Sequence, residues 1–285
     1  MSGEAAFIAR LRDIASNPAA RGLDDDCAVL EIGGETLVLT HDMIAEGKHF
    51  REDADMADVA WKLVAVNLSD LAAKGAEPVG VLLGYSLGRD DARFLEGLRD
   101  ILETFEVPLL GGDTIRSDGP RSFGLTALGR ATHRPVPDRR GAKPGNAVWV
   151  TGKLGRAMLG FGGDPAHSEA YSRPTPRLAE GRALAPHVTA MMDISDGLLL
   201  DGWRMAEASQ ATIVIERALV PVADPAQADE AMRWGDDYEL LFTLPDGTTP
   251  PVAATRIGHV RPRQDAALSL DGSPLTPGDG LGYQH

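Results

Sequence analysis

The chain has one cysteine, few aromatic residues and fewer basic than acidic side chains. Cys27 is the only cysteine among 285 residues, so no internal disulfide can form and a cytoplasmic, reducing location is expected. Aromatic residues make up 5% of the chain and hydrophobic residues 43%, which indicates a mostly aliphatic core. The net charge of −14 leaves no basic surface of the kind that binds nucleic acid, so no nucleic-acid partner is expected.

Long apolar runs are missing as well. No apolar stretch reaches the roughly 18 residues that a membrane-spanning helix needs, so no membrane partner is expected. Charged residues from Glu4 to Asp13 interrupt the apolar residues of the N-terminus, which is not the pattern of a signal peptide. Cys27 begins an apolar run and is interpreted as a small buried residue rather than a nucleophile.

Apolar periodicity predicts two α+β halves of similar size. In the first half, helices are expected over 4–15, over 57–74 and from Asp90 onward, and strands over 27–32, 36–40, 79–87, 107–110 and 123–128. In the second half, helices are expected near 176–185 and 198–209, and strands over 147–150, 190–194, 212–216, 238–243 and 256–260. The prolines and arginines of 130–146 indicate a linker, which divides the chain into domains 1–135 and 136–285.

Aspartates recur in small clusters, many of them beside glycine: 24–26, His41-Asp42, Ser69-Asp70, Gly111-Gly112-Asp113, 193–197 and 235–237. Together they indicate an oxygen-only site for several Mg²⁺ ions, since Mg²⁺ prefers carboxylates, water and phosphate oxygens. Asp26 precedes a predicted strand and Asp42 follows one. If a turn at Gly33-Gly34 pairs the two strands, both carboxylates reach one edge of the sheet and repel each other unless a cation lies between them. A solvated turn at 24–26 is the alternative.

Three other segments carry candidate chemistry. Two glycines before Asp113 let the backbone approach a phosphate, although no Walker A lysine follows and a simple turn is the alternative. In Asp193-Ile194-Ser195-Asp196-Gly197, the serine hydroxyl between two carboxylates suits a phosphate or a metal-bound water, and helix capping is a compatible alternative. His49, preceded by Lys48, would neutralise a substrate phosphate if it is not merely structural.

These motifs, taken in order, resemble one family. They are Asp-Asp-Cys-Ala at 25–28, His41-Asp42 with 47–50, the 66–73 helix segment, 111–114, 140–145, 193–198 and 236–240. The chain resembles the thiamine-monophosphate kinase family of the aminoimidazole-ribonucleotide-synthetase-like superfamily. The resemblance runs from Phe7 to Tyr283, and the ordered set is specific although each motif alone is weak.

The resemblance implies a two-domain α+β, PurM-like fold in which the N-terminal sheets of two subunits pair into a dimeric barrel-like core. It implies ATP-dependent phosphorylation of thiamine monophosphate to thiamine diphosphate by a homodimer. It places several Mg²⁺ ions on Asp26, Thr40, Asp42, Asp70, Asp113, Asp193 and Asp196. It places ATP on Gly112, Asp113, Arg140 and Ser195, and thiamine monophosphate on His49, Asp236 and Tyr283. A requirement for K⁺ is left open.

Three departures from the family pattern stand out. His41 replaces a threonine that often precedes the aspartate, and Phe105 replaces a tyrosine that can face adenine. Trp234-Gly235-Asp236-Asp237-Tyr238 replaces a glycine-glycine-glutamate-aspartate-tyrosine motif, so Asp236 is one methylene shorter than the family's glutamate. Two alternatives stay open: another ATP-using synthetase of the superfamily, or a sensor that binds Mg²⁺ and nucleotide without turnover.

Overall fold

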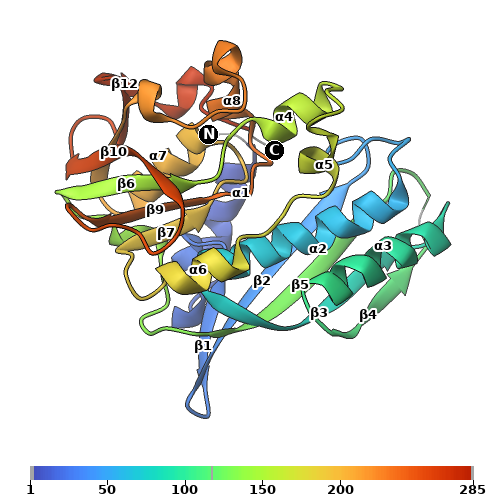
Figure 1. Ribbon diagram of the computed structural model, residues 1–285. Helices are drawn as coiled ribbons and strands as arrows, with labels where there is room; N and C mark the ends of the chain where they lie inside the picture. Colours follow the sequence, from blue (N-terminus) through green and yellow to red (C-terminus); the bar gives the residue numbers. More distant parts are fainter. Residues whose placement is uncertain (1–2, 117, 284–285) are drawn as a thin grey trace.

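A computed structural model describes residues 3–116 and 118–283, which form two β-sheets with helices between and around them (Figure 1). The first sheet has the strand order β1-β2-β5-β3-β4. Its strands are β1 (Ala28–Ile32), β2 (Glu35–Ala45), β3 (Ala76–Ser86), β4 (Leu109–Ile115) and β5 (Ser122–Ala131). Gly33 and Gly34 both have positive φ, the conformation that a tight two-residue hairpin between β1 and β2 requires.

Two helices, α2 (Met56–Ala73) and α3 (Asp91–Thr104), lie along the same side of this first sheet (Figure 1). The Asp55 side chain caps α2 by accepting a hydrogen bond of 2.9 Å from the Ala57 backbone N–H. Every residue of α2 except Asp58 and Trp61 is buried. A helix that is buried nearly all round must be covered on both sides, so α2 is the element on which the two halves meet.

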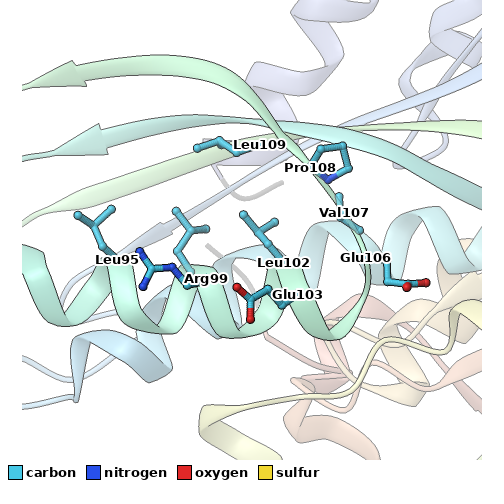
Figure 2. Close-up of a pocket in the computed structure, with 9 residues that line it drawn as sticks. Leu95, Arg99, Leu102, Glu103, Glu106, Val107, Pro108 and Leu109 are labelled. Carbon is cyan, nitrogen blue, oxygen red and sulfur yellow. The ribbon is translucent and has the colours of Figure 1, made fainter.

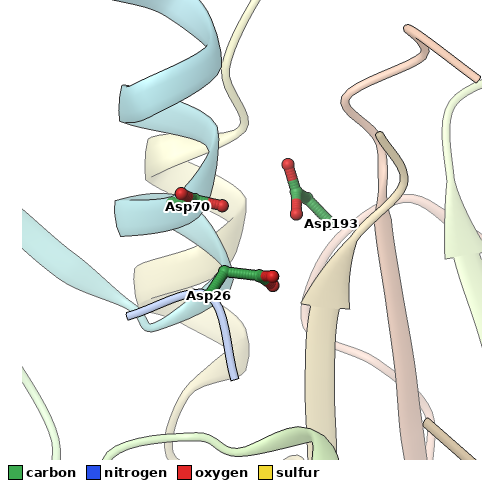
Figure 3. Close-up of side chains that lie close together, drawn as sticks. All are labelled: Asp26, Asp70 and Asp193. Atoms are coloured by element: carbon green, nitrogen blue, oxygen red, sulfur yellow. The ribbon is translucent and has the colours of Figure 1, made fainter. Parts of the chain in front are cut away.

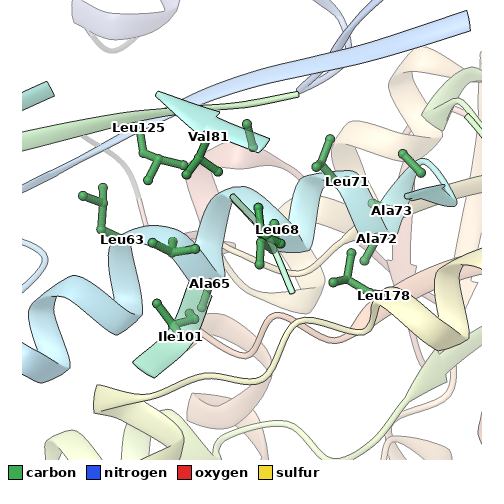
Figure 4. Packing of buried hydrophobic residues seen from close by; sticks show 14 of the residues in the cluster. Leu63, Ala65, Leu68, Leu71, Ala72, Ala73, Val81, Ile101, Leu125 and Leu178 are labelled. Atoms are coloured by element: carbon green, nitrogen blue, oxygen red, sulfur yellow. The ribbon is translucent and has the colours of Figure 1, made fainter. Parts of the chain in front are cut away.

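The core around α2 draws side chains from both halves. Leu63, Leu68 and Leu71 pack with Val81 and Leu125 of the first sheet, and Leu178 of the second half lies against the far end of the helix (Figure 4). Gly181 approaches α2 so closely that a Cβ there would lie 1.9 Å from the Ala72 carbonyl oxygen. Each fully buried leucine contributes roughly 1.5–3 kcal/mol, so this shared core holds the halves together.

The second sheet has the strand order β12-β11-β8-β10-β6-β9-β7 and its own apolar core. Its strands are β6 (Asn146–Thr151), β7 (Ala190–Asp193), β8 (Ala211–Ile215), β9 (Leu240–Pro245), β10 (Ala254–Pro262), β11 (Leu268–Leu270) and β12 (Ser273–Leu275). The remaining helices are α1 (Gly3–Arg12), α4 (Arg156–Phe161), α5 (Ser168–Ser172), α6 (Leu178–Leu184), α7 (Leu198–Ala208) and α8 (Ala228–Trp234). Short 3₁₀ turns lie at Pro18–Leu23, Arg139–Gly141, Arg217–Leu219, Pro225–Gln227 and Pro277–Asp279. Among the described residues, none of the helices is long and apolar enough to cross a membrane.

The two α+β halves are confirmed, with two differences from the predicted elements. Asp42 lies inside β2, which continues to Ala45, rather than after the strand. The segment predicted as a buried strand at 107–110 begins β4 at Leu109, and all seven residues of this edge strand are exposed. The first sheet is open in the described part of the chain, and the barrel-like core predicted between two subunits stays a prediction.

Candidate active site

Three aspartates from distant parts of the sequence converge in space (Figure 3). Asp26 precedes β1, Asp70 lies in the last turns of α2, and Asp193 ends β7. One carboxylate oxygen from each lies within 4.8 Å of the other two. Asp70 and Asp193 are buried, at 5% and 3% exposure, whereas the Asp26 side chain is 37% exposed. An oxygen-only donor set that is open on one side fits a Mg²⁺ ion that keeps some of its waters.

Neighbouring side chains hold these carboxylates in place. The Thr40 hydroxyl donates a hydrogen bond to the Asp70 carboxylate, and the Ser69 hydroxyl donates to Asp193 at 2.6 Å. Asp42 lies in β2 two residues beyond Thr40, on the same face of the sheet, and its backbone N–H donates to the Asn67 side chain at 2.9 Å. Asn67 and Asp70 are three residues apart on α2 and therefore neighbour each other on that helix. Ser69 was not predicted to have a role, because a serine within an apolar helix gives no sign of the strand it will face.

The carboxyl groups have strongly perturbed pKa values. Burial and the carboxylates of Asp26 and Asp196 raise the pKa of Asp42 to about 6. Burial and Asp26 raise the pKa of Asp193 to about 8, and burial and Asp42 raise the pKa of Asp70 well above its usual range. Such mutual repulsion is relieved when a divalent cation binds between the groups.

Asp26 behaves differently because cations surround it. Burial would raise the pKa of its carboxyl, but Arg139 and Lys74 lower it to about 2. The Arg139 guanidinium bonds the Asp26 carboxylate directly. Arg140, the arginine predicted to contact ATP, lies apart from this group and pairs with Asp138 at 2.5 Å. Sequence reasoning could not separate the two adjacent arginines, because the short turn Arg139–Gly141 decides which one faces the aspartates.

The Ser195-Asp196 loop is shaped by two residues of α7 that were not predicted. The Asp201 carboxylate accepts hydrogen bonds from the backbone N–H groups of Ser195 (3.1 Å) and Asp196 (3.0 Å). Arg204 donates to both Asp196 and Asp201, at 2.5 and 2.9 Å. The Tyr283 backbone N–H donates to the Asp196 carbonyl at 3.0 Å, which brings the C-terminal segment to the site. The three-residue spacing of Asp201 and Arg204 on a predicted helix is the sequence feature that indicates their ion pair.

Two of the residues predicted to bind thiamine monophosphate, His49 and Asp236, contact one lysine. Asp236 accepts a hydrogen bond of 2.7 Å from Lys62 and one of 2.9 Å from the Tyr238 hydroxyl. Lys62 also reaches the His49 carbonyl oxygen at 3.4 Å. The structure therefore joins His49 and Asp236 across the two halves. Lys62 was missed, because a lysine in a predicted helix is ordinarily assigned to its solvent face.

Gly112 and Asp113 lie elsewhere, on the exposed edge strand β4. The Gly84 position of β3 pairs with Asp113 on one side and with Gly124 of β5 on the other, and Gly124 pairs with Met43 of β2. Three strand spacings of about 4.8 Å place Asp113 roughly 14 Å from β2. Gly112 also has a purely structural need, since a Cβ there would lie 1.9 Å from the Leu83 carbonyl oxygen.

His41 does not join the aspartates. It precedes Asp42 in β2, so its side chain projects from the opposite face of the sheet. There it is exposed, and its Nδ1 lies 2.9 Å from the Thr126 hydroxyl. The replacement of threonine by histidine at this position therefore alters the outer face of the sheet rather than the carboxylate group.

An open hollow of about 560 Å³ lies between α3 and β4, lined by Leu95, Arg99, Leu102, Leu109 and their neighbours (Figure 2). None of the residues that line it in the described structure is a predicted site residue. A second hollow, of about 610 Å³, is lined by Arg140, Asp138 and Thr189 among others. The carboxylate chemistry therefore does not coincide with either hollow.

Comparison with known proteins agrees with this geometry. Residues 24–131 match the N-terminal domain of AIR synthase related protein, and residues 143–270 match the C-terminal domain. The thiamine-monophosphate kinase of Escherichia coli K12 is 36% identical over 321 aligned residues, which cover 99% of this chain and 98% of that protein.

Solved structures give the same result. The structure of AaThiL complexed with AMPPCP and TMP superposes with a TM-score of 0.89 and 27% identity, covering 99% of this chain and 97% of that one. E. coli HypE, a hydrogenase maturation protein, covers 98% of both chains with a TM-score of 0.66 but 16% identity, a likeness of fold alone. The two-domain match and the identity to the E. coli enzyme show that the chain belongs to the thiamine-monophosphate kinase family, among the AIR synthase related proteins of PurM-like fold.

Proposed function

We propose that this chain transfers the γ-phosphoryl group of ATP to the phosphate of thiamine monophosphate, which yields thiamine diphosphate and ADP. The observation that carries this conclusion is the converging Asp26-Asp70-Asp193 group within a chain that matches the E. coli kinase over 99% of its length. The AaThiL structure holds the ATP analogue AMPPCP and TMP, which supports the same pair of substrates here.

We propose that Asp26, Asp42, Asp70, Asp193 and Asp196, with Thr40, hold the Mg²⁺ ions. Bound Mg²⁺ neutralises charge on the phosphates and so lowers the repulsion between ATP and an anionic acceptor. The acceptor phosphate is already ionised at neutral pH, so no general base is required. The chain's own contribution is placement: Ser69 and Thr40 fix two of the carboxylates, and Asp201 fixes the Ser195-Asp196 loop.

We assign ATP contacts to Ser195, Gly112 and Asp113, as the resemblance implies. For the arginine, the geometry supports Arg139 more than Arg140, because the Arg139 guanidinium is already among the carboxylates. We assign thiamine monophosphate to His49, Asp236 and Tyr283, which lie near one another through Lys62 and the Asp196 loop. K⁺ is not part of this proposal, and the cytoplasmic location stays a prediction.

We further propose that two subunits pair through the first sheet, with the domain boundary near residue 135. Helices α2 and α3 cover one face of this sheet, while Met43, Leu82 and Ile115 are 58%, 45% and 58% exposed. Leu109 and Leu110 on the edge strand are also about half exposed. An apolar face of this kind is typical of a subunit interface. A partner packed there could supply its own Asp113 to the site, since Asp113 of the same chain lies three strands away from β2, roughly 14 Å across the sheet.

The reaction is tested by measuring ADP release with Mg·ATP and either thiamine monophosphate or free thiamine, with the product identified by chromatography. We expect thiamine diphosphate from thiamine monophosphate only. The Asp42→Asn variant is the control, because it keeps the fold and removes one proposed Mg²⁺ ligand. Tight Mg·ATP binding without turnover of thiamine monophosphate would contradict the proposal.

The shared site is tested by mixing two inactive variants, Asp42→Asn and Asp113→Asn. If each site uses the Asp42 of one subunit and the partner subunit's Asp113, mixed dimers contain one intact site. Random exchange would then restore about a quarter of the wild-type turnover. If both residues act within one subunit, the mixture stays inactive.

A further inference from the structure

Lys62 of α2 is a buried cation at the place where the two halves meet. Its side chain lies within the core-facing surface of the helix and is 3% exposed. A charged side chain that is removed from water must be paired and hydrogen-bonded, or the fold loses free energy. The contacts of this ammonium group therefore indicate which residues it stabilises.

Lys62 contacts two residues that are proposed to bind thiamine monophosphate, and it also lies over one aromatic ring. Its Nζ donates to the Asp236 carboxylate at 2.7 Å and to the His49 carbonyl oxygen at 3.4 Å. It also lies 4.2 Å from the centre of the Tyr171 ring, within the range of a cation–π interaction. Asp236 and Tyr171 come from the second half, whereas Lys62 and His49 come from the first. One ammonium group therefore contacts a residue assigned to thiamine monophosphate in each half, His49 in the first and Asp236 in the second.

The loop that carries Asp236 needs such a restraint. Asp236 and Tyr238 have φ of 56° and 50°, a left-handed conformation that is unfavourable for residues other than glycine. Two backbone hydrogen bonds, from the N–H groups of Asp236 and Tyr238 to the carbonyls of Ser195 and Ile194, hold the main chain at 2.8 Å each. Lys62 and the Tyr238 hydroxyl hold the two carboxylate oxygens. Without Lys62, one oxygen of Asp236 loses its partner and the carboxylate is free to turn.

We propose that Lys62 is a positioning residue for thiamine monophosphate, which acts by fixing the Asp236 carboxylate against the acceptor. This inference depends on the proposed function, because it assumes that Asp236 contacts the acceptor. It assigns no role to Lys62 in ATP binding, since its hydrogen bonds go to Asp236 and His49, which are assigned to thiamine monophosphate.

The test is a double-mutant cycle of Lys62→Met and Asp236→Asn. Methionine keeps most of the length of the lysine stem and removes the charge. We expect Lys62→Met to raise the KM for thiamine monophosphate by about tenfold to a hundredfold, the effect of losing a hydrogen bond between charged groups. The KM for ATP should stay within about twofold, and Lys153→Met, at an exposed lysine, should change neither constant.

The cycle separates positioning from a merely structural role. If Lys62 acts through Asp236, the double variant has the same KM for thiamine monophosphate as Asp236→Asn alone. Two outcomes would overturn the inference. In the first, the increases in KM for thiamine monophosphate of the two single variants multiply in the double variant. In the second, Lys62→Met leaves this KM unchanged. If Lys62→Met does not fold, as judged by thermal melting, Lys62→Gln is measured in the same cycle, with the same two outcomes.

Failure of this inference is distinct from failure of the proposed function. If the wild-type chain does not form thiamine diphosphate, the function itself is wrong. If the wild type is active and the Lys62 variants keep its KM for thiamine monophosphate, only the positioning role is wrong.

Discussion

Replacing Asp193 by asparagine should stabilise the metal-free protein while it destroys activity. Asp193 is 3% exposed, and burial and the Asp26 carboxylate raise its pKa from 3.8 to about 8. The unfolded chain releases this proton above pH 3.8, whereas the folded chain retains it up to about pH 8. The group therefore contributes stability below pH 3.8, and this contribution is lost as pH rises towards 8.

The magnitude follows from the same values. Between pH 3.8 and pH 7, each pH unit costs the folded state about 1.4 kcal/mol, or about 4 kcal/mol in all. Asparagine carries no charge, and its carbonyl oxygen can still accept the hydrogen bond that Ser69 donates to Asp193 at 2.6 Å. Because the remaining carboxylates also relax, we expect Asp193→Asn to gain about 1–3 kcal/mol of stability at pH 7. For a chain of this size, that gain raises the melting temperature by about 2–5 °C.

The assay is thermal unfolding in EDTA and in Mg²⁺, with turnover measured alongside. In Mg²⁺, the wild type should gain stability and the variant should gain little, because Asp193 is a proposed ligand through which the ion would bind the folded state. Turnover should fall by about a hundredfold or more. A variant that melts at a lower temperature than the wild type in EDTA, or that keeps full turnover, would refute the reasoning.

A second buried aspartate supplies the matched contrast. Asp25 accepts hydrogen bonds from Lys74 at 2.5 Å and from Arg21 at 2.6 Å, and the side chains of Asp25 and Lys74 are both fully buried. Asp25→Asn leaves the Lys74 ammonium without its carboxylate and should cost about 3–5 kcal/mol. The two variants remove the same charge at neighbouring positions, and their effects on stability should have opposite signs.

Three further predictions concern the metal site and the first sheet. Because the pKa of Asp42 is raised to about 6, Mg²⁺ binding measured by calorimetry should weaken as pH falls from 8 to 5, and a pH-independent affinity would count against Asp42 as a ligand. Gly112→Ala places a Cβ 1.9 Å from the Leu83 carbonyl oxygen, so β4 should detach from β3, seen as faster amide exchange in both strands; unchanged exchange would contradict this. Phe123→Ala empties a fully buried aromatic position next to Tyr85 and Phe94 and should cost about 3–5 kcal/mol in denaturant unfolding, whereas a cost below about 1 kcal/mol would show that the site collapses.

Much of the fold followed from local patterns. The hairpin was predictable because Gly33-Gly34 lies between two apolar runs, and α2 because its apolar residues recur at helical spacing. The error at β4 has a physical cause. Val107 to Leu110 are apolar, as in a buried strand, yet the strand ends up at the edge of the sheet, where a second subunit is the proposed cover. A chain that buries surface against a partner shows the same pattern as one that buries it internally.

The sequence alone predicted the kind of site and the family. An acidic chain with aspartates at the ends of strands and helices predicted a cation site. The ordered motifs indicated the family, and Asp26, Asp70 and Asp193 were among the residues named for the metal.

Only the tertiary structure decided which side chains meet. Arg139 rather than Arg140 faces Asp26, and Lys62, Ser69 and Asp201 turn inward. For Arg139, Lys62 and Ser69, local spacing does not encode the choice, because each bonds an element more than a hundred residues away. Strand order is likewise decided only by the tertiary fold. Asp113 was therefore grouped with the other aspartates from sequence, although β4 places it at the far edge of the first sheet.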